Sequence, residues 1–266
     1  MRIQLWLLGA AMLGACSHPG EGDAGADAAV DPDVDAAVVP DVDAGPGMPD
    51  GGDGSLLFSE TFDADGAWPA GWSALGGVAS ATVVGGRGHL VPTVTSYSLA
   101  RMGHALPPGT VDVDVRFTMT MTDGARQGVG VYVRQSGGYL QATTPRGRGY
   151  CVFVEAFRGA IIGAWREVDG GESPVRMESV TALVDGTSYA VHFRVTQGAG
   201  VTTIAARVWP AGTPEPQAWT IDTTDATPSL QGIDGGVAID AWNTATPGNG
   251  PVPAPIFVDD LEIRAW

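Results

Sequence analysis

The chain has 266 residues, with 30 acidic residues, 14 arginines and no lysine, and its formal net charge is −16 at pH 7. So acidic a chain, with no basic patch interleaved with aromatic residues, is a poor partner for nucleic acid or for anionic membrane surfaces. The charge is uneven, because residues 17–54 hold ten acids and no lysine or arginine.

The amino terminus carries a short apolar run, residues 5–13, which follows Arg2 and leads into Leu13-Gly14-Ala15-Cys16. The run is too short to span a bilayer and is typical of a signal peptide over residues 1–16. Its end resembles the bacterial lipobox, which implies a lipid on Cys16 and placement at the outer membrane or cell surface. The alternative is an ordinary signal peptide with a chance cysteine.

Residues 17–54 repeat Asp-Ala, Asp-Val and Pro units and contain no aromatic residue. Such a segment cannot bury enough surface to offset the entropy of ordering, and its like charges keep it extended. The Asp-rich stretch at 31–35 lacks the glycine and the terminal glutamate of a calcium loop. We therefore expect an acidic tether over 17–54, a single folded domain over 55–266, and a monomer.

Period-two alternation of apolar and polar residues runs through the domain, and no stretch shows a sustained helical period. The organising element is a predicted hairpin of strands 189–196 and 202–209, joined by a glycine turn and followed by Pro210, Pro214 and Pro216. The longest alternation is 110–121, with Val111, Val113, Val115, Phe117, Met119 and Met121 facing inward. A loop over 66–72 is expected to be pinned by Trp68 and Trp72. Further strands are expected at 56–63, 83–84, 89–91, 97–102, 128–135, 150–157, 160–168, 175–180, 219–222, 236–242 and 256–265.

These short strands predict an all-β fold, an antiparallel sandwich or a barrel. Cys151 is the domain's only cysteine and lies inside a predicted strand, so we expect a buried, inert thiol and no disulfide within the domain.

Three blocks of sequence narrow the fold. Residues 58–63 (FSETFD) are followed by Trp-Pro-x-Gly-Trp, residues 256–263 read IFVDDLEI, and the central hairpin carries Arg-x-Trp before a proline-rich turn. Together they resemble concanavalin A-like lectin/glucanase domains, the laminin-G-type jelly rolls. The resemblance implies an antiparallel two-sheet β-sandwich over 56–266. It also implies a structural calcium ion between the first and last strands, held by Glu60 and Asp259. The alternative is that these two acids are ordinary exposed residues.

Catalysis finds little support in the sequence. The Glu-x-Asp-x-x-Glu motif of the superfamily's glucanases is missing, and without lysine the chain cannot form the lysine motif of its alginate lyases. No Gly-x-Ser-x-Gly, His-Glu-x-x-His or Cys/His cluster points to a hydrolase or to catalytic zinc. A glycan-cleaving hydrolase or lyase with an unfamiliar catalytic set stays as an alternative.

The polar positions of the predicted strands mix aromatic rings with Arg, Asp and Glu, a combination that suits a saccharide. If those strands are neighbours, one face displays the predicted binding set: Tyr132, Arg134, Glu155, His192, Arg194, Arg207, Trp209, Asp240 and Trp242. Tyr139, Tyr150 and Trp165 are secondary candidates. The same residues also fit a plain solvated sheet surface.

We therefore predict a lipid-anchored surface protein with a non-catalytic, carbohydrate-binding jelly-roll domain. Besides the enzyme, the remaining alternative is an adhesion or structural module that binds protein.

Overall fold

A computed structural model describes residues 54–93, 97–156, 159–244 and 255–266 of the chain. The predicted signal peptide, the lipobox cysteine Cys16 and almost all of the predicted tether lie outside the described residues. The chain divides into residues 1–48 and 49–266, and the described residues all belong to the second unit.

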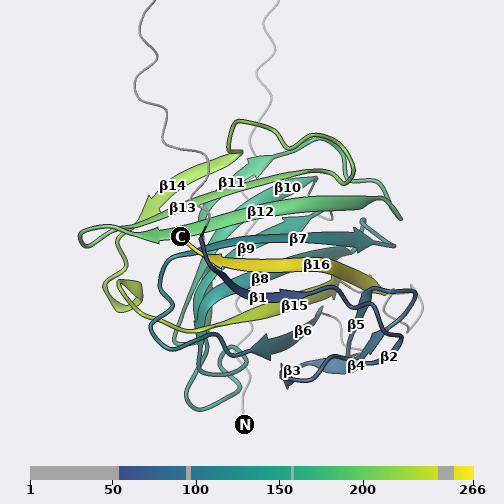
Figure 1. The fold of residues 1–266 in the computed structure, drawn as a ribbon, viewed down its shortest axis with the longest axis horizontal. Helices are drawn as coiled ribbons and strands as arrows, with labels where there is room; N and C mark the ends of the chain where they lie inside the picture. Colours follow the sequence, from purple (N-terminus) through teal and green to yellow (C-terminus); the bar gives the residue numbers. More distant parts are fainter. Residues whose placement is uncertain (1–53, 94–96, 157–158, 245–254) are drawn as a thin grey trace, which may run out of the picture. The chain divides into compact units, whose positions relative to one another are not determined.

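The domain is an antiparallel sandwich of two sheets, and Figure 1 looks onto sheet A with sheet B behind it. Sheet A runs in the order β14-β13-β12-β7-β16-β5-β4-β2, with β1 paired to β16. Its strands are β1 (Leu56–Glu60), β2 (Gly66–Ala67), β4 (Val78–Val83), β5 (Gly88–Pro92), β7 (Val113–Met121), β12 (Ser188–Gln197), β13 (Thr202–Pro210), β14 (Ile221–Asp225) and β16 (Ile256–Ala265).

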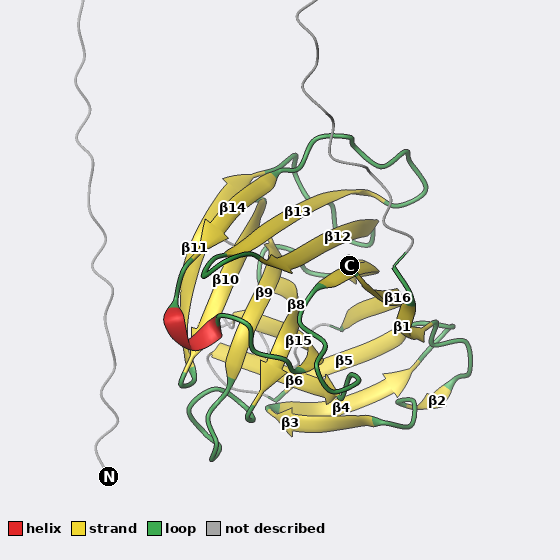
Figure 2. Ribbon diagram, turned by 60° about the vertical axis from the view of Figure 1, so that its left-hand side comes forward, coloured by secondary structure: helices red, strands yellow, loops and turns green. Residues whose placement is uncertain are grey.

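Sheet B runs in the order β11-β10-β9-β8-β15-β6-β3. Its strands are β3 (Trp72–Gly76), β6 (Tyr97–His104), β8 (Gln127–Ser136), β9 (Arg148–Glu155), β10 (Ile161–Val168), β11 (Gly171–Ser179) and β15 (Gly236–Thr244). The only helix of the described residues is a short 3₁₀ turn at Pro228–Leu230, red in Figure 2. It follows that no helix in this part of the chain could cross a membrane.

The alternation predicted for 110–121 is confirmed within β7, where Val113, Val115, Phe117, Met119 and Met121 are buried in the core. The strand begins at Val113, so Val111 precedes it and is only half-buried. Each buried aliphatic or aromatic side chain contributes about 1.5–3 kcal/mol of hydrophobic stabilisation. The core lies between the two sheets and draws on nearly every strand.

The central hairpin is also confirmed, because β12 pairs with β13 from Tyr189↔Pro210 to Gln197↔Thr202. On its other side β12 pairs with β7, so the hairpin and β14 together form one end of sheet A.

The predicted tryptophan loop is pinned by a chain of edge-on ring contacts. Phe62 and Trp68 have ring centroids 5.0 Å apart, Trp68 and Trp72 are 6.2 Å apart, and Trp72 and Phe58 are 5.8 Å apart. Trp72 also begins β3, a strand that the sequence did not predict.

Candidate functional site

The predicted binding set does not share one face, and that part of the prediction is wrong. Strands β8, β9 and β15 belong to sheet B, whereas β12 and β13 belong to sheet A. The residues of these strands that point away from the core therefore face opposite sides of the sandwich. Sheet B carries Tyr132, Glu155, Asp240 and Trp242, and sheet A carries His192, Arg194, Arg207 and Trp209.

Arg134 belongs to neither outer face. Its φ of 51° lies in the left-handed region, at a bulge where the pairing of β8 with β9 shifts. The side chain is 1% exposed, and its guanidinium donates to the Val111 carbonyl (2.8 Å) and to the Thr202 hydroxyl (3.0 Å). Burial lowers the pKa of this guanidinium. Arg134 therefore ties strands of the two sheets together and cannot reach a ligand in this conformation.

On the outer face of sheet B, aromatic rings lie over glycines. A Cβ on Gly130 would lie 2.1 Å from the Phe153 ring, and one on Gly128 would lie 2.1 Å from the Trp242 ring. The Phe153 and Trp242 rings meet edge-on, with centroids 4.6 Å apart. Tyr139 and Leu140, from the loop after β8, and Trp165 pack against this cluster. Phe153 and Trp242 are consequently buried, at 7% and 2% exposure.

The same face holds a buried charge cluster around Arg101, which the sequence reasoning missed. The Arg101 guanidinium donates to both carboxylate oxygens of Asp240, at 2.7 and 2.8 Å, and to Glu167 at 2.7 Å. A third carboxylate, that of Glu172, lies 3.6 Å from Arg101 and is bonded to the Tyr132 hydroxyl. These residues come from five different strands, so only the strand pairing brings them together.

Three carboxyl groups thus share a single guanidinium in a site from which water is largely excluded. Burial raises the pKa of Asp240 and of Glu167, although Arg101 opposes this rise in both. Burial, helped by the charge of Asp240, raises the pKa of Glu172 to about 7. Arg101, Glu167 and Asp240 have side chains at 0% exposure, and that of Glu172 is 23% exposed. The contribution of this cluster to the free energy of unfolding therefore depends on pH. Of its charged side chains, only that of Glu172 contacts solvent.

Glu155 lies on the same face, on one cross-strand row with Gly128 and Trp242, and is 2% exposed. Among the secondary candidates, Tyr139 packs over this face, and its hydroxyl donates a hydrogen bond to the Leu99 carbonyl (2.6 Å). Trp165 packs beside Phe153. Tyr150 instead lies in the core, where its hydroxyl bonds to Asp225 (2.8 Å).

The outer face of sheet A is organised around His192, which is itself 0% exposed. Its Nε2 lies 2.7 Å from Asp114 and its Nδ1 lies 2.5 Å from Glu215. Burial alone would raise the pKa of Asp114, but hydrogen bonds from His192 and Arg194 hold it below its usual value. The pKa of Glu215 is likewise lowered, because hydrogen bonds from Arg116 and His192 outweigh its burial.

Two tryptophans and two arginines stack over this network. The Trp219 ring centroid lies 4.1 Å from the Arg207 guanidinium carbon and 5.1 Å from that of Arg194, which also lies 3.3 Å from the Trp266 ring centroid. Arg207 donates to the carbonyls of Pro216 (2.5 Å) and Gln217 (2.9 Å). The proline-rich segment after β13 is thereby held against sheet A.

This face is partly open to solvent. The Arg116 side chain is 44% exposed, Trp266 is 41% exposed, and Trp209 and Trp219 are half-buried. We call the outward-facing residues Asp114, Arg116, His192, Arg194, Arg207, Trp209, Glu215, Trp219 and Trp266 the sheet A face.

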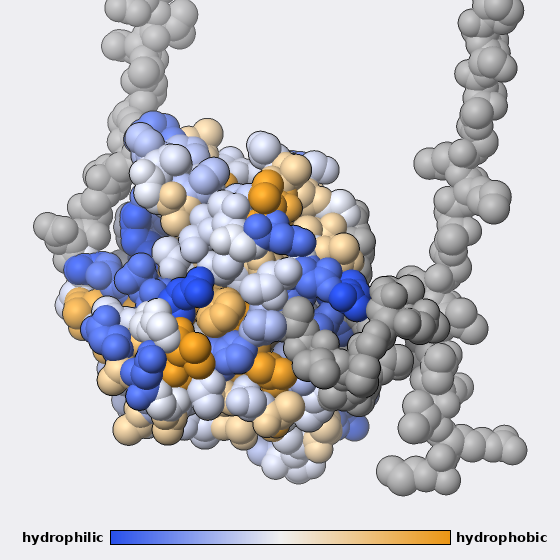
Figure 3. All heavy atoms as spheres, turned by 90° about the vertical axis from the view of Figure 1, so that its right-hand side faces the viewer, coloured by the Kyte–Doolittle hydropathy of each residue, from blue (hydrophilic) through white to orange (hydrophobic). Residues whose placement is uncertain are grey.

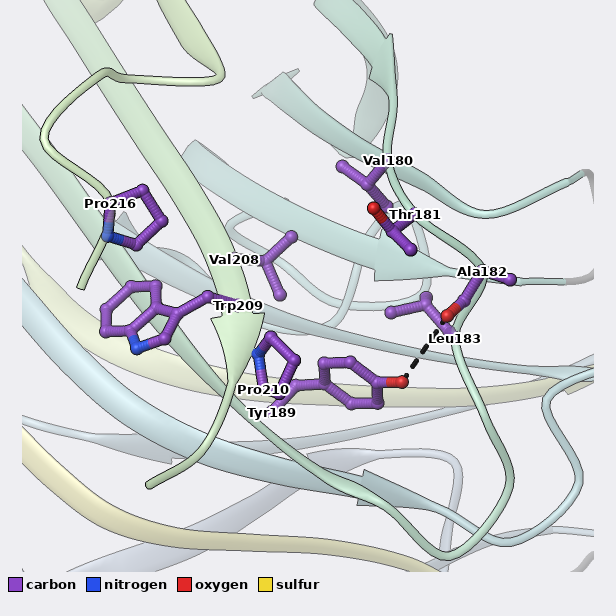
Figure 4. Close-up of a pocket in the computed structure, with 9 residues that line it drawn as sticks. All are labelled: Val180, Thr181, Ala182, Leu183, Tyr189, Val208, Trp209, Pro210 and Pro216. Carbon is purple, nitrogen blue, oxygen red and sulfur yellow. Dashed lines mark hydrogen bonds between the residues drawn. The ribbon is translucent and has the colours of Figure 1, made fainter. Parts of the chain in front are cut away.

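At one end of the sheet A face, Trp209 borders a pocket of about 280 Å³. Figure 4 shows Trp209 and Pro216 on one side of this pocket and residues 180–183 on the other. We call it the Trp209 pocket; its lining is Val180, Thr181, Ala182, Leu183, Tyr189, Val208, Trp209, Pro210 and Pro216.

The predicted calcium pair has other bonds within the chain. A Glu60 oxygen accepts the Phe62 N–H (3.0 Å), and an Asp259 oxygen accepts the Asp260 N–H (2.8 Å). Burial, with the nearby charges of Asp260 and Asp63, raises the pKa of Asp259. Within the described ranges no three His, Cys, Asp or Glu side chains gather as metal ligands.

Strand order, sheet pairing and core together define a two-sheet antiparallel jelly roll with a galectin-like fold. The sequence matches no protein-family model and no curated protein. Solved structures nevertheless share the fold.

A Bacillus subtilis protein of unknown function with a galectin-like fold has a TM-score of 0.54 at 10% identity, covering 80% of this chain and 96% of that one. The Ca²⁺-bound exoplasmic/lumenal domain of VIP36 has a TM-score of 0.51 at 10% identity, covering 79% and 90%. The carbohydrate recognition domain of Emp46p, in a mutant form, has a TM-score of 0.50 at 9% identity, covering 73% and 88%. At such low identity these similarities establish the fold alone.

Proposed function

We propose that the domain binds a glycan on the sheet A face, without catalysis. The observation that carries this proposal is the difference in exposure between the two halves of the predicted set. On sheet B, Tyr132 and Asp240 are 0% exposed, and Glu155 and Trp242 are 2% exposed. On sheet A, His192 and Arg207 are buried, but Arg194 and Trp209 are only half-buried, and Arg116 and Trp266 of the same face are 44% and 41% exposed.

The chemistry of the sheet A face suits a saccharide. Trp209, Trp219 and Trp266 offer apolar ring surfaces to sugar C–H groups, while Arg116 and Glu215 place charged hydrogen-bonding groups beside them. The three arginines of the face all pair with Asp114 or Glu215, so little positive charge is left to attract a polyanion, which favours a neutral glycan. The fold shared with a carbohydrate recognition domain supports the same function.

A glycan array probed with the full chain tests this proposal. We expect at least one glycan to bind, and Trp209→Ala to reduce its affinity by about five- to hundredfold, since stacking of a ligand ring on an aromatic side chain is worth about 1–3 kcal/mol. The matched control is Trp165→Ala, which removes a half-buried tryptophan from sheet B. Loss of binding in Trp165→Ala with retention in Trp209→Ala would move the site to sheet B, and no binding at all would remove the lectin function.

The other two function classes have less support. For a hydrolase, the carboxyl groups gathered around Arg101 are the obvious candidates, but Glu167 and Asp240 are fully buried and cannot touch a substrate in this conformation. For a protein-binding module, the large exposed apolar residues of the described ranges are scattered: Leu56, Val84, Met177, Val184 and Trp266. Figure 3 shows one side of the domain, where apolar side chains form small spots among polar ones.

We further propose that Glu60 and Asp259 contribute to a calcium site. They fit only in part, because Ca²⁺ takes six to eight oxygens and the described side chains supply no group of three acids there. The Ca²⁺-bound form of VIP36, which shares the fold, supports testing the ion. A melting temperature that rises with calcium and falls with a chelator would support the site, and an unchanged one would remove it.

For localisation, we propose a lipid on Cys16 and an acidic tether that holds the domain at the bacterial outer membrane or cell surface. The support is the lipobox-like sequence before Cys16. The expected result is that the full chain fractionates with membranes, whereas Cys16→Ala is released into the soluble fraction. A variant that stays in the membrane fraction would contradict the lipid anchor.

A further inference from the structure

The Trp209 pocket differs in chemistry from the sheet A face that it adjoins. Seven of its nine lining residues have apolar side chains, including Val180, Leu183, Val208 and two prolines, and only Thr181 and Tyr189 carry hydroxyls. Tyr189 lies in its wall, as Figure 4 shows, and its hydroxyl is already engaged by the chain. It accepts the Val184 N–H (2.9 Å) and lies 3.5 Å from the Ala182 carbonyl.

This lining sets what the pocket can hold. A sugar hydroxyl inside it would lose its hydrogen bonds to water and find few replacements, which is costly. An apolar group would lose only its contact with water, which is favourable. The volume of about 280 Å³ lies just below the range of pockets that enclose whole drug-sized ligands. Because of this apolar lining, and not because of its volume, the pocket suits a substituent of a few carbons better than a complete sugar ring.

Trp209 connects the two regions. It stands opposite Ala190 of β12, beside the row of Arg207 and His192, and it also borders the pocket. A sugar stacked on this ring would therefore have one edge over the pocket and the other over the charged residues of the sheet A face.

We propose that the Trp209 pocket binds a short acyl substituent of the glycan, so that the domain prefers acylated to unsubstituted sugars. This inference rests on the proposed glycan binding and adds the part of the ligand that fills the pocket. The amide or ester link of the acyl group lies at the rim, where it stays hydrated, and the carbon chain lies between Leu183 and Val208.

The probes for a test are glucosamine and its N-acetyl, N-butanoyl and N-hexanoyl derivatives, titrated calorimetrically against the full chain. We expect affinity to rise about fourfold for each added methylene until the pocket is full. Thr181→Phe adds a ring at the exposed rim, where it fills the pocket without disturbing the core, and should reduce all derivatives to the affinity of glucosamine. Val184→Phe is the matched control, because Val184 is 59% exposed, lies three residues away and does not line the pocket.

Equal affinity across the series, or a chain-length effect that Thr181→Phe leaves intact, would overturn the acyl proposal. These outcomes are distinct from failure of the proposed function. If the array finds a glycan that depends on Trp209 but the acyl series is flat, only the acyl proposal fails. If no glycan binds on the array and no member of the acyl series binds, the proposed function fails and the acyl proposal fails with it.

Discussion

The carboxyl group of Glu172 should make the stability of the domain depend on pH. Its pKa is raised from 4.5 to about 7, first by burial and then by the charge of Asp240. A pKa higher in the folded state than in the unfolded state means that folding favours the protonated form. The stabilisation is complete below pH 4.5 and is lost as pH rises through about 7. The difference between the two pKa values corresponds to about 3 kcal/mol.

Glu172→Gln isolates this effect, because glutamine has nearly the same shape and stays neutral. Relative to wild type, the free energy of unfolding of Glu172→Gln should increase by about 3 kcal/mol between pH 4.5 and about pH 8. Urea unfolding followed by tryptophan fluorescence at several pH values measures this difference. The glutamine carbonyl can still accept the Tyr132 hydroxyl, so the main change is the removed charge.

Glu178→Gln provides the control, since Glu178 lies on the same strand and pairs with Arg176 at the surface. We expect it to change the unfolding free energy by no more than about 1 kcal/mol. A difference between Glu172→Gln and wild type that stays constant with pH, or shrinks as pH rises, would refute the electrostatic reasoning.

Two further predictions concern the outer face of sheet B. Gly130→Ala would place its Cβ 2.1 Å from the Phe153 ring and should lower the free energy of unfolding, measured in urea, by about 1–3 kcal/mol. Gly198→Ala is the control, because its Cβ would lie 3.3 Å from the nearest atom, and it should lower the free energy of unfolding by less. Equal effects of the two substitutions would contradict the close ring packing. Cys151 is fully buried, and burial raises the pKa of its thiol. The peptide that carries Cys151 should therefore resist alkylation in the folded protein and react in denaturant, as measured by mass spectrometry. Labelling of this peptide in the folded protein would count against the burial.

The fold was largely predictable because most strands show the alternation of apolar and polar residues in their own sequence. β7 and the β12–β13 hairpin follow directly from period-two patterns, and the resemblance at the two ends of the domain identified the jelly roll. β3 escaped prediction because WSALG does not alternate, and its tryptophan was assigned to the preceding loop.

The site was less predictable, for a physical reason. Alternation separates the two faces of one strand, but it does not say which sheet the strand joins. Alternation alone therefore assigns Tyr132 and His192 to one surface, although β8 and β12 lie in different sheets. The bulge at Arg134 has no counterpart in the sequence pattern, and the carboxylates around Arg101 come together only through strand order.

The aromatic cluster around Tyr132, which covers the outer face of sheet B, has a consequence for how the domain opens locally. Every residue from 127 to 135 in β8 is buried, because the main core covers one side of the strand and the Tyr132 cluster covers the other. Strand β14, in contrast, lies at the edge of sheet A. Local opening exposes less apolar surface at such an edge than in a strand covered on both sides. The slowest amide hydrogen exchange should therefore occur in β8 and its neighbours β9 and β15, and the edge strand β14 should exchange faster.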